Sequence, residues 1–197
     1  MVYIRCKHMV YTPPPPVRRS RKSDIIFYSP DNQKTNREVR KLKPANELEG
    51  VTIIKKLDDI PELKETLISI YETKSHKDVS RYSLLLAEHV LSLTGMPRNE
   101  TVESCFSVSC AWQEGTAKFQ EARQVAFALH RLAREETNPA YVLTYRTLGQ
   151  IAATPHVKRH ALVGSNYAVK LINRMYPNDL DKVREMREKQ ISLMQSV

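Results

Sequence analysis

The residues whose types and spacing could do chemistry form two cationic stripes, the first of them within 116–136. Arg123, Phe127, His130 and Arg134 recur there at intervals of three and four residues. In a helix this spacing places them on one face, apart from the apolar residues. Arginines interleaved with an aromatic ring suit single-stranded nucleic acid, because guanidinium groups contact phosphates while a base stacks on the ring.

The second stripe lies within 155–175, where the apolar residues fall on the opposite side of the expected helix. Its members are Arg159, Asn166, Lys170 and Arg174. Cations at this spacing can follow successive phosphates, and an asparagine amide can bond a base edge or a sugar hydroxyl. The two stripes together favour a nucleic-acid-binding groove if the fold brings them side by side.

Each stripe also has an ordinary explanation that the sequence leaves open. Phe127 could belong to the core, with the neighbouring arginines paired to Glu135 or Glu136. The second stripe could be the solvated outer face of an amphipathic helix.

The histidine pair at 156 and 160 has a spacing that zinc sites use, because residues four apart share a helix face. Lys158 and Arg159 lie between them, however, and two cations oppose a bound dication. No glutamate follows His156 as the metalloprotease pattern requires. We therefore predict surface histidines and no metal site.

Nothing else in the sequence indicates an active site. Cys105 and Cys110 are five residues apart, which on a helix turns them about 140° from each other, so they are expected to be small buried hydrophobes. Only five glycines are present, whereas phosphate-binding loops, nucleophile elbows and dinucleotide-binding turns all require glycine. The prediction is a protein that is not an enzyme and has no cofactor.

The positive charge is concentrated at the N-terminus. The chain of 197 residues has a net charge of +9, and residues 1–46 alone hold eleven Lys or Arg against three acidic residues. A dense basic arm on a nearly neutral body indicates attachment to a polyanion. The arm residues expected to contact nucleic acid are Arg18, Arg19, Arg21, Lys22, Arg40, Lys41 and Lys43.

The arm at 1–46 is predicted to be extended or disordered, because four prolines at 13–16 favour a polyproline segment. The same run followed by Arg18 fits a weak ligand pattern for SH3-type domains. A short apolar segment could dock on a neighbouring subunit and drive assembly. It consists of Ile25, Ile26, Phe27 and Tyr28.

The remainder, 47–197, is predicted to be one helical domain. Apolar residues recur at helical spacing from about residue 57, and we find no convincing strand after that point. The expected fold is all-α, a bundle of six or seven helices over about 57–195 behind the arm. The helix starts are expected at Asp59, Asp78, Asn99, Thr116, Thr154 and Asn178 or Asp179, with stops that include Gly95.

Location follows from what the sequence lacks. The first residues contain no apolar core of a signal peptide, and the longest apolar run is too short to span a membrane. Three cysteines do not make a disulfide framework. An intracellular protein without membrane attachment is expected.

The favoured hypothesis is a structural protein that coats or packages nucleic acid, most plausibly single-stranded RNA, and self-associates through its arm. Viral coat and nucleocapsid subunits combine a helical core with an extended arm in this way, which would place the protein in a virion. A first alternative is a DNA-binding regulator with a helix-turn-helix-like unit at 144–175. A second is a non-enzymatic adaptor with a polyproline arm.

Overall fold

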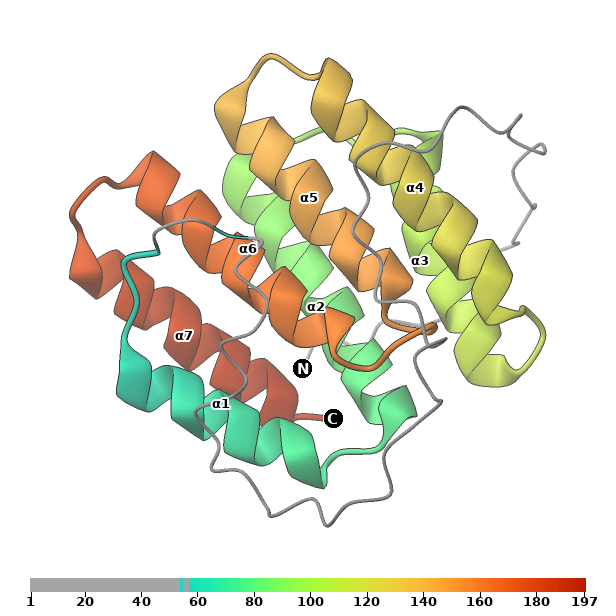
Figure 1. Ribbon diagram of the computed structural model, residues 1–197, viewed down its shortest axis with the longest axis horizontal. Coiled ribbons are helices and arrows are strands. Elements are labelled where there is room, and N and C mark those ends of the chain that lie inside the picture. The colour runs from blue at the N-terminus through green and yellow to red at the C-terminus, as the bar shows by residue number, and fades with distance from the viewer. Residues whose placement is uncertain (1–53, 55–56) are drawn as a thin grey trace, which may run out of the picture. The chain divides into compact units, whose positions relative to one another are not determined.

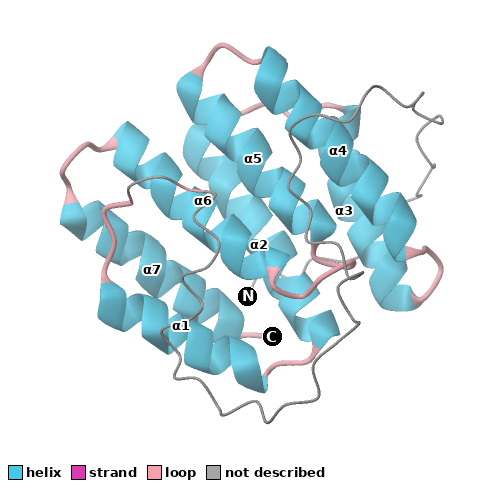
Figure 2. Cartoon of the chain, viewed as in Figure 1, coloured by secondary structure: helices cyan, strands magenta, loops and turns pink. Residues whose placement is uncertain are grey.

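The computed structural model describes residue 54 and residues 57–197, and this part of the chain forms seven α-helices and no strand (Figures 1 and 2). The all-α prediction is therefore confirmed. The helices are α1 (Pro61–Thr73), α2 (His76–Thr94), α3 (Glu100–Glu114), α4 (Phe119–Glu135), α5 (Pro139–Ala153), α6 (His160–Met175) and α7 (Leu180–Gln195). The arm at 1–46 lies outside the described residues, so the predicted division at residues 46 and 47 stays a prediction.

Several helix ends fall where the residue types predicted them. The Asn99 side chain caps α3 by accepting a hydrogen bond from the Val102 amide, and Asp179 caps α7 through the Lys182 amide. Gly95 ends α2 in the left-handed conformation, with φ 63°, which glycine adopts without steric cost.

Three predicted starts are displaced by two or more residues. Asp78 does not cap α2, which begins at His76 behind Ser75, whose side chain accepts a hydrogen bond from the Asp78 amide. Thr116 does not open α4, which begins at Phe119, where Glu121 accepts a hydrogen bond from the Lys118 amide. Thr154 does not open α6 but continues the helical backbone of α5 and is completely buried. Turns fill the stretch that follows, and α6 begins only at His160. A threonine before a proline therefore marked the end of one helix, not the start of the next.

Helix α5 is the centre of the bundle and contacts α2, α3, α4 and α6. In Figure 1 it lies between α4 and α6, with α2 behind it. From Thr144 to Ala153 every residue of α5 is buried except Arg146. The side chains exposed around this half of α5 therefore come mainly from α4 and α6. Arg146 is the one charged side chain that α5 adds to them.

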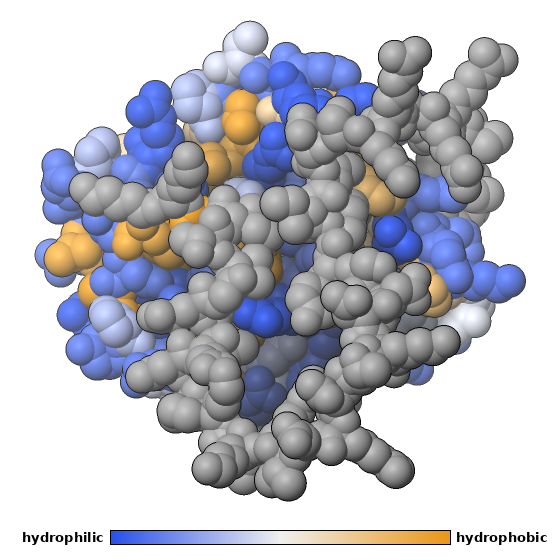
Figure 3. Space-filling model, in the orientation of Figure 1, coloured by the Kyte–Doolittle hydropathy of each residue, from blue (hydrophilic) through white to orange (hydrophobic). Residues whose placement is uncertain are grey.

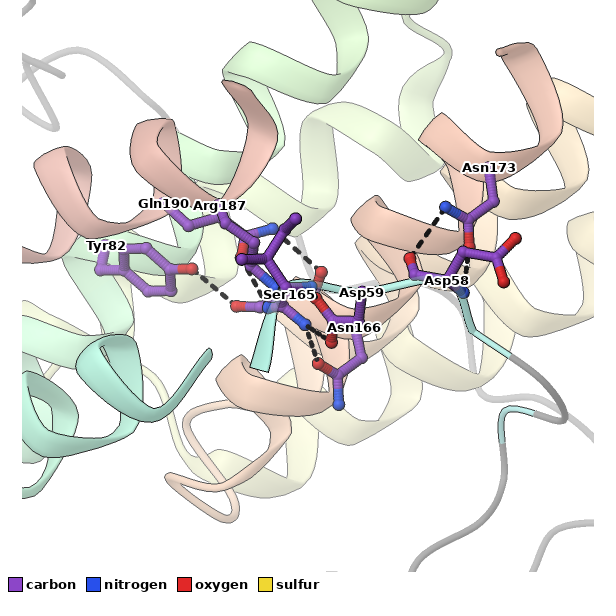
Figure 4. A network of polar contacts seen from close by, with 9 residues as sticks. Asp58, Asp59, Tyr82, Ser165, Asn166, Asn173, Arg187 and Gln190 are labelled. Carbon is purple, nitrogen blue, oxygen red and sulfur yellow. Dashed lines mark hydrogen bonds and ion pairs between the residues drawn. The ribbon is translucent and has the colours of Figure 1, made fainter. Parts of the chain in front are cut away.

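A buried polar network joins α7 to α6 and to the segment before α1 (Figure 4). The Arg187 guanidinium donates two hydrogen bonds to the Asp59 carboxylate, at 2.8 and 2.6 Å. It also donates to the side-chain oxygens of Gln190 and Asn166, at 2.8 and 2.9 Å. Burial acts to raise the pKa of Asp59, but the hydrogen bonds and charge of Arg187 outweigh it, so this pKa lies below its usual value.

The same network reaches α2. The Gln190 amide donates to the backbone oxygen of Ser165, whose hydroxyl lies 2.6 Å from the buried hydroxyl of Tyr82. Asn173 of α6 holds the segment before α1 as well, because its amide bonds both the backbone N–H and the backbone oxygen of Asp58 (Figure 4). These contacts hold the segment before α1 against α6 and α7.

Candidate functional site

Positive charge within the helical body belongs to α4, α5, α6 and their connections. Residues 116–176 contain nine Lys or Arg and three acidic residues, and residues 137–176 contain no acidic residue at all. Helix α5 packs against both α4 and α6, so these basic residues belong to adjoining elements. This part of the molecule is thus a cationic layer.

The stripe predicted on α4 lies at the border between α4 and its neighbours, because Arg123 and His130 are partly buried and His130 contacts Arg146 and Gln150 of α5, whereas Arg134 is exposed. Ala122, Val125 and Leu129 of the opposite side are buried, whereas Phe127 is only partly buried. The Arg123 guanidinium lies 5.7 Å from the centre of the Phe127 ring, within the range of a cation–π interaction. Phe127 is therefore a boundary residue and not a member of the buried core.

The acidic residues at the end of α4 do not neutralise the stripe. Arg134 is exposed and forms no ion pair with another described residue. The Glu136 carboxylate instead accepts hydrogen bonds from the Thr137 and Asn138 backbone amides.

His130 connects the stripe to α5 and α6 through a chain of side chains. Its Nε2 lies 3.5 Å from the Gln150 amide nitrogen, and the Gln150 oxygen lies 2.7 Å from Nδ1 of His160. On the other side, Nδ1 of His130 lies 3.5 Å from the Arg146 guanidinium. Three helices thus meet in a cluster of two imidazoles, one amide and one guanidinium.

Both imidazoles of this cluster are held in the neutral form. Burial first, and then the charges of Arg146, His160 and Arg134, lower the pKa of His130 to about 4. Burial, His156 and Arg123 lower the pKa of His160 to about 4 as well. A neutral imidazole can still accept or donate a hydrogen bond, so the cluster offers polar contacts without adding positive charge at pH 7.

The glycine at 149 makes room for His130. A Cβ atom at this position would lie 2.6 to 2.9 Å from three atoms of the imidazole ring. Neither Gly149 nor Arg146 was predicted as a site residue, because both lie among apolar residues of one helix. Spacing along one helix does not reveal a residue that matters because it contacts a side chain of another helix.

The stripe predicted on α6 is divided by the structure. Arg159 lies just before the helix, and Asn166 points toward α7, where its oxygen accepts a hydrogen bond from Arg187. Lys170 is partly buried and Arg174 is exposed, in the second half of the helix. The side chain through which α6 approaches the α4 stripe is His160, which the prediction had not included among the site residues.

The helix-turn-helix interpretation of 144–175 does not fit the geometry. Helices α5 and α6 lie side by side and run in opposite directions (Figure 1). The recognition motif instead crosses two helices steeply, through a short turn. Here six residues, 154–159, separate the helices. The two helices form an antiparallel pair within the bundle.

Other predicted site residues lie outside the described residues. These are the assembly segment at 25–28 and the arm residues at 18, 19, 21, 22, 40, 41 and 43. Their predicted roles stay predictions. Within the described part, no group of three His, Cys, Asp or Glu side chains could hold a metal ion. Nor does that part contain a helix long and apolar enough to cross a membrane.

Comparison with known protein families decides the assignment. Residues 69–197 match the family described as "Imm-5 like putative immunity protein". The chain belongs to this family. The match begins within α1 and includes the whole of α2 to α7, so the cationic layer and the histidine cluster both lie within the family's region. No curated protein and no solved structure matches the chain.

Membership of the Imm-5-like family corrects one expectation. A basic arm and a helical body indicated a viral coat or nucleocapsid subunit, and this interpretation is wrong because the family is one of immunity proteins. The error has a physical origin. Net charge indicates whether a chain attracts a polyanion, and helix content indicates how its core packs. Proteins of many unrelated functions have the same net charge and helix content.

Proposed function

We propose that this chain is an immunity protein that protects the cell producing it by binding a toxin protein and blocking the toxin's action. The observation that supports this proposal is the family match over residues 69–197, which includes six complete helices and the end of a seventh. The function is assigned to the helical body, because the first 68 residues lie outside the match.

Inhibition by binding is also suited to the fold. Tight inhibitors present a surface that is already formed, because ordering a surface on binding lowers the affinity. The helices here are joined by short connections, and the buried Arg187 network ties α7 to α6 and Asp59. Such a body can present side chains from several helices without rearrangement.

We further propose that the chain acts by binding and not by catalysis. The only residues of the cationic layer with strongly lowered pKa values are His130 and His160, and both contact protein side chains within the cluster. Their surroundings explain the shifts through burial and neighbouring cations. A role in packing and in shaping the surface is therefore sufficient to explain why His130 and His160 are present.

The test is neutralisation by the full-length chain. Candidate toxins are the proteins encoded on either side of its gene, each expressed in a bacterial host alone and together with this chain. One of them should stop growth, and co-expression should restore it. The purified pair should form a complex with a Kd of about 10⁻⁹ M or tighter, since related kinds of inhibitor pair reach far lower values.

Two results would contradict the proposal. Growth that this chain fails to restore against every toxic neighbour would remove the immunity function. Growth restored without a stable complex between the purified proteins would remove the binding mechanism and point to an enzymatic one.

A further inference from the structure

Two of the three large hydrophobic residues that are most exposed in the described chain lie together at one end of the bundle. Phe119 at the start of α4 is 38% exposed, and Val157 in the turn before α6 is 44% exposed. The Phe119 ring stacks on the ring of His156, with 5.1 Å between centres and 18° between planes. The third residue, Leu180, opens α7 at the left of the view in Figure 1, away from the α3–α4 and α5–α6 turns.

Trp112, near the end of α3, joins the same end of the molecule. Its ring lies 4.8 Å from the ring of His76, whose Nε2 lies 2.6 Å from the backbone oxygen of Thr154. Thr154 is two residues before His156, so the tryptophan and the stacked Phe119 flank one turn. Figure 1 shows the α3–α4 turn, the α5–α6 turn and the start of α2 gathered at this end.

Cations border these aromatic residues. The positive charge of Arg123 acts on both His156 and His160 and, after burial, contributes to lowering the pKa of each. The Lys158 ammonium lies 4.3 Å from the centre of the Tyr71 ring and donates a hydrogen bond to the Tyr71 backbone oxygen. Aromatic side chains and arginine are the residue types enriched where protein partners bind most strongly.

We call this the end surface and define it by Trp112, Phe119, Arg123, His156 and Val157. In Figure 3 the visible face is mostly hydrophilic, with hydrophobic surface gathered mainly toward the left, over α6 and the start of α7.

We propose that the end surface is where this protein docks on its toxin, against an acidic surface of that toxin with an apolar residue at its centre. This inference rests on the proposed immunity function. The 154–159 connection, which supplies His156 and Val157, has Lys158 and Arg159 as its charged residues and no acidic one. This supports an acidic partner, because opposite charges across an interface favour docking and like charges oppose it. The exposed Phe119 and Val157 indicate that the partner is a protein and not a nucleic acid. Exposed apolar side chains fill pockets on protein partners, whereas contacts to phosphates require only cations.

The test compares matched variants of the full-length protein against the toxin identified by neutralisation. Phe119→Ala, Val157→Glu and Arg123→Glu change the end surface. Leu180→Ala, Leu180→Glu and Arg184→Glu make the same types of change at exposed positions of α7. Circular dichroism establishes that each variant is folded, and calorimetry gives each Kd.

Each end-surface variant should weaken toxin binding by about 10- to 100-fold, whereas the α7 variants should change it by less than about threefold. A toxin in which one surface carboxylate is replaced by lysine should recover binding to the Arg123→Glu variant. The two side chains then attract each other again, with the negative charge on this protein and the positive charge on the toxin.

The outcomes separate this inference from the function on which it rests. If the unchanged chain neutralises no toxin, the proposed function fails. If it neutralises the toxin and the end-surface variants do so equally well, the docking surface lies elsewhere and this inference is overturned. It is also overturned if these variants lose binding to a single-stranded RNA oligonucleotide while their toxin binding stays intact.

Discussion

Arg187 of α7 forms a bidentate ion pair with Asp59, which is 128 residues earlier in the chain, and the arginine side chain has no exposed surface. The carboxylate belongs to the segment just before α1, so this one pair connects the first and last helices of the described bundle. The remaining guanidinium contacts, to Gln190 and Asn166, satisfy the buried charge with hydrogen bonds.

Removing the arginine should therefore be costly. We expect Arg187→Met to lower the free energy of unfolding by about 3–5 kcal/mol, because the partly buried Asp59 carboxylate loses its charged partner. Urea denaturation at pH 7 measures this value. Arg184→Met, at an exposed position one turn earlier, should change it by less than about 0.5 kcal/mol. Equal losses in the two variants would show that the ion pair does not hold α1 in place.

Two helical glycines should respond oppositely to alanine. Gly149→Ala should destabilise the protein by about 1–3 kcal/mol, because the new methyl group would lie 2.6 Å from the His130 ring, which must then move. Gly164→Ala should stabilise it by about 0.5–1 kcal/mol, since its nearest neighbours would be 3.5 Å away, an ordinary contact.

Thermal unfolding of both glycine variants tests this pair of predictions. A stable Gly149→Ala protein would mean that the His130 ring is not confined as the structure has it.

How much could be predicted differs between the fold and the site. Helix periodicity and caps such as Asn99 and Asp179 predicted the all-α bundle, because capping and amphipathic spacing are local properties of the chain. The α4 stripe was predicted for the same reason. Its connection to Arg146 and His160 was not, because those contacts join three helices and depend on how the helices pack.

The hydrogen bond that Asn166 accepts was equally hidden from the sequence. On an amphipathic helix an asparagine beside Lys170 is indistinguishable from a solvated residue, yet its oxygen accepts a hydrogen bond from Arg187. Function was the least predictable property, since basic arms and helical bundles occur in proteins of many classes.

Acid should weaken the fold through the histidine cluster. The pKa values of His130 and His160 are about 4 in the folded protein and about 6.5 when unfolded. The unfolded state therefore binds more protons between these values. Stability should be fully present above pH 6.5 and should fall as the pH drops toward 4, by about 1–2 kcal/mol for each histidine between pH 7 and pH 5.

The double variant His130→Gln, His160→Gln isolates this effect. Its free energy of unfolding, measured by urea at several pH values, should change much less between pH 7 and pH 5 than that of the unchanged protein. Parallel pH profiles for the two proteins would assign the acid sensitivity to other groups.

Neutralisation by a single surface variant tests the central claim most directly. Cells that express the toxin with the unchanged chain should grow, cells with the Leu180→Glu variant should grow equally well, and cells with the Val157→Glu variant should be killed although the variant is folded and abundant. If the unchanged chain gives no protection against any protein encoded beside its gene, the immunity function assigned to this helical body is contradicted.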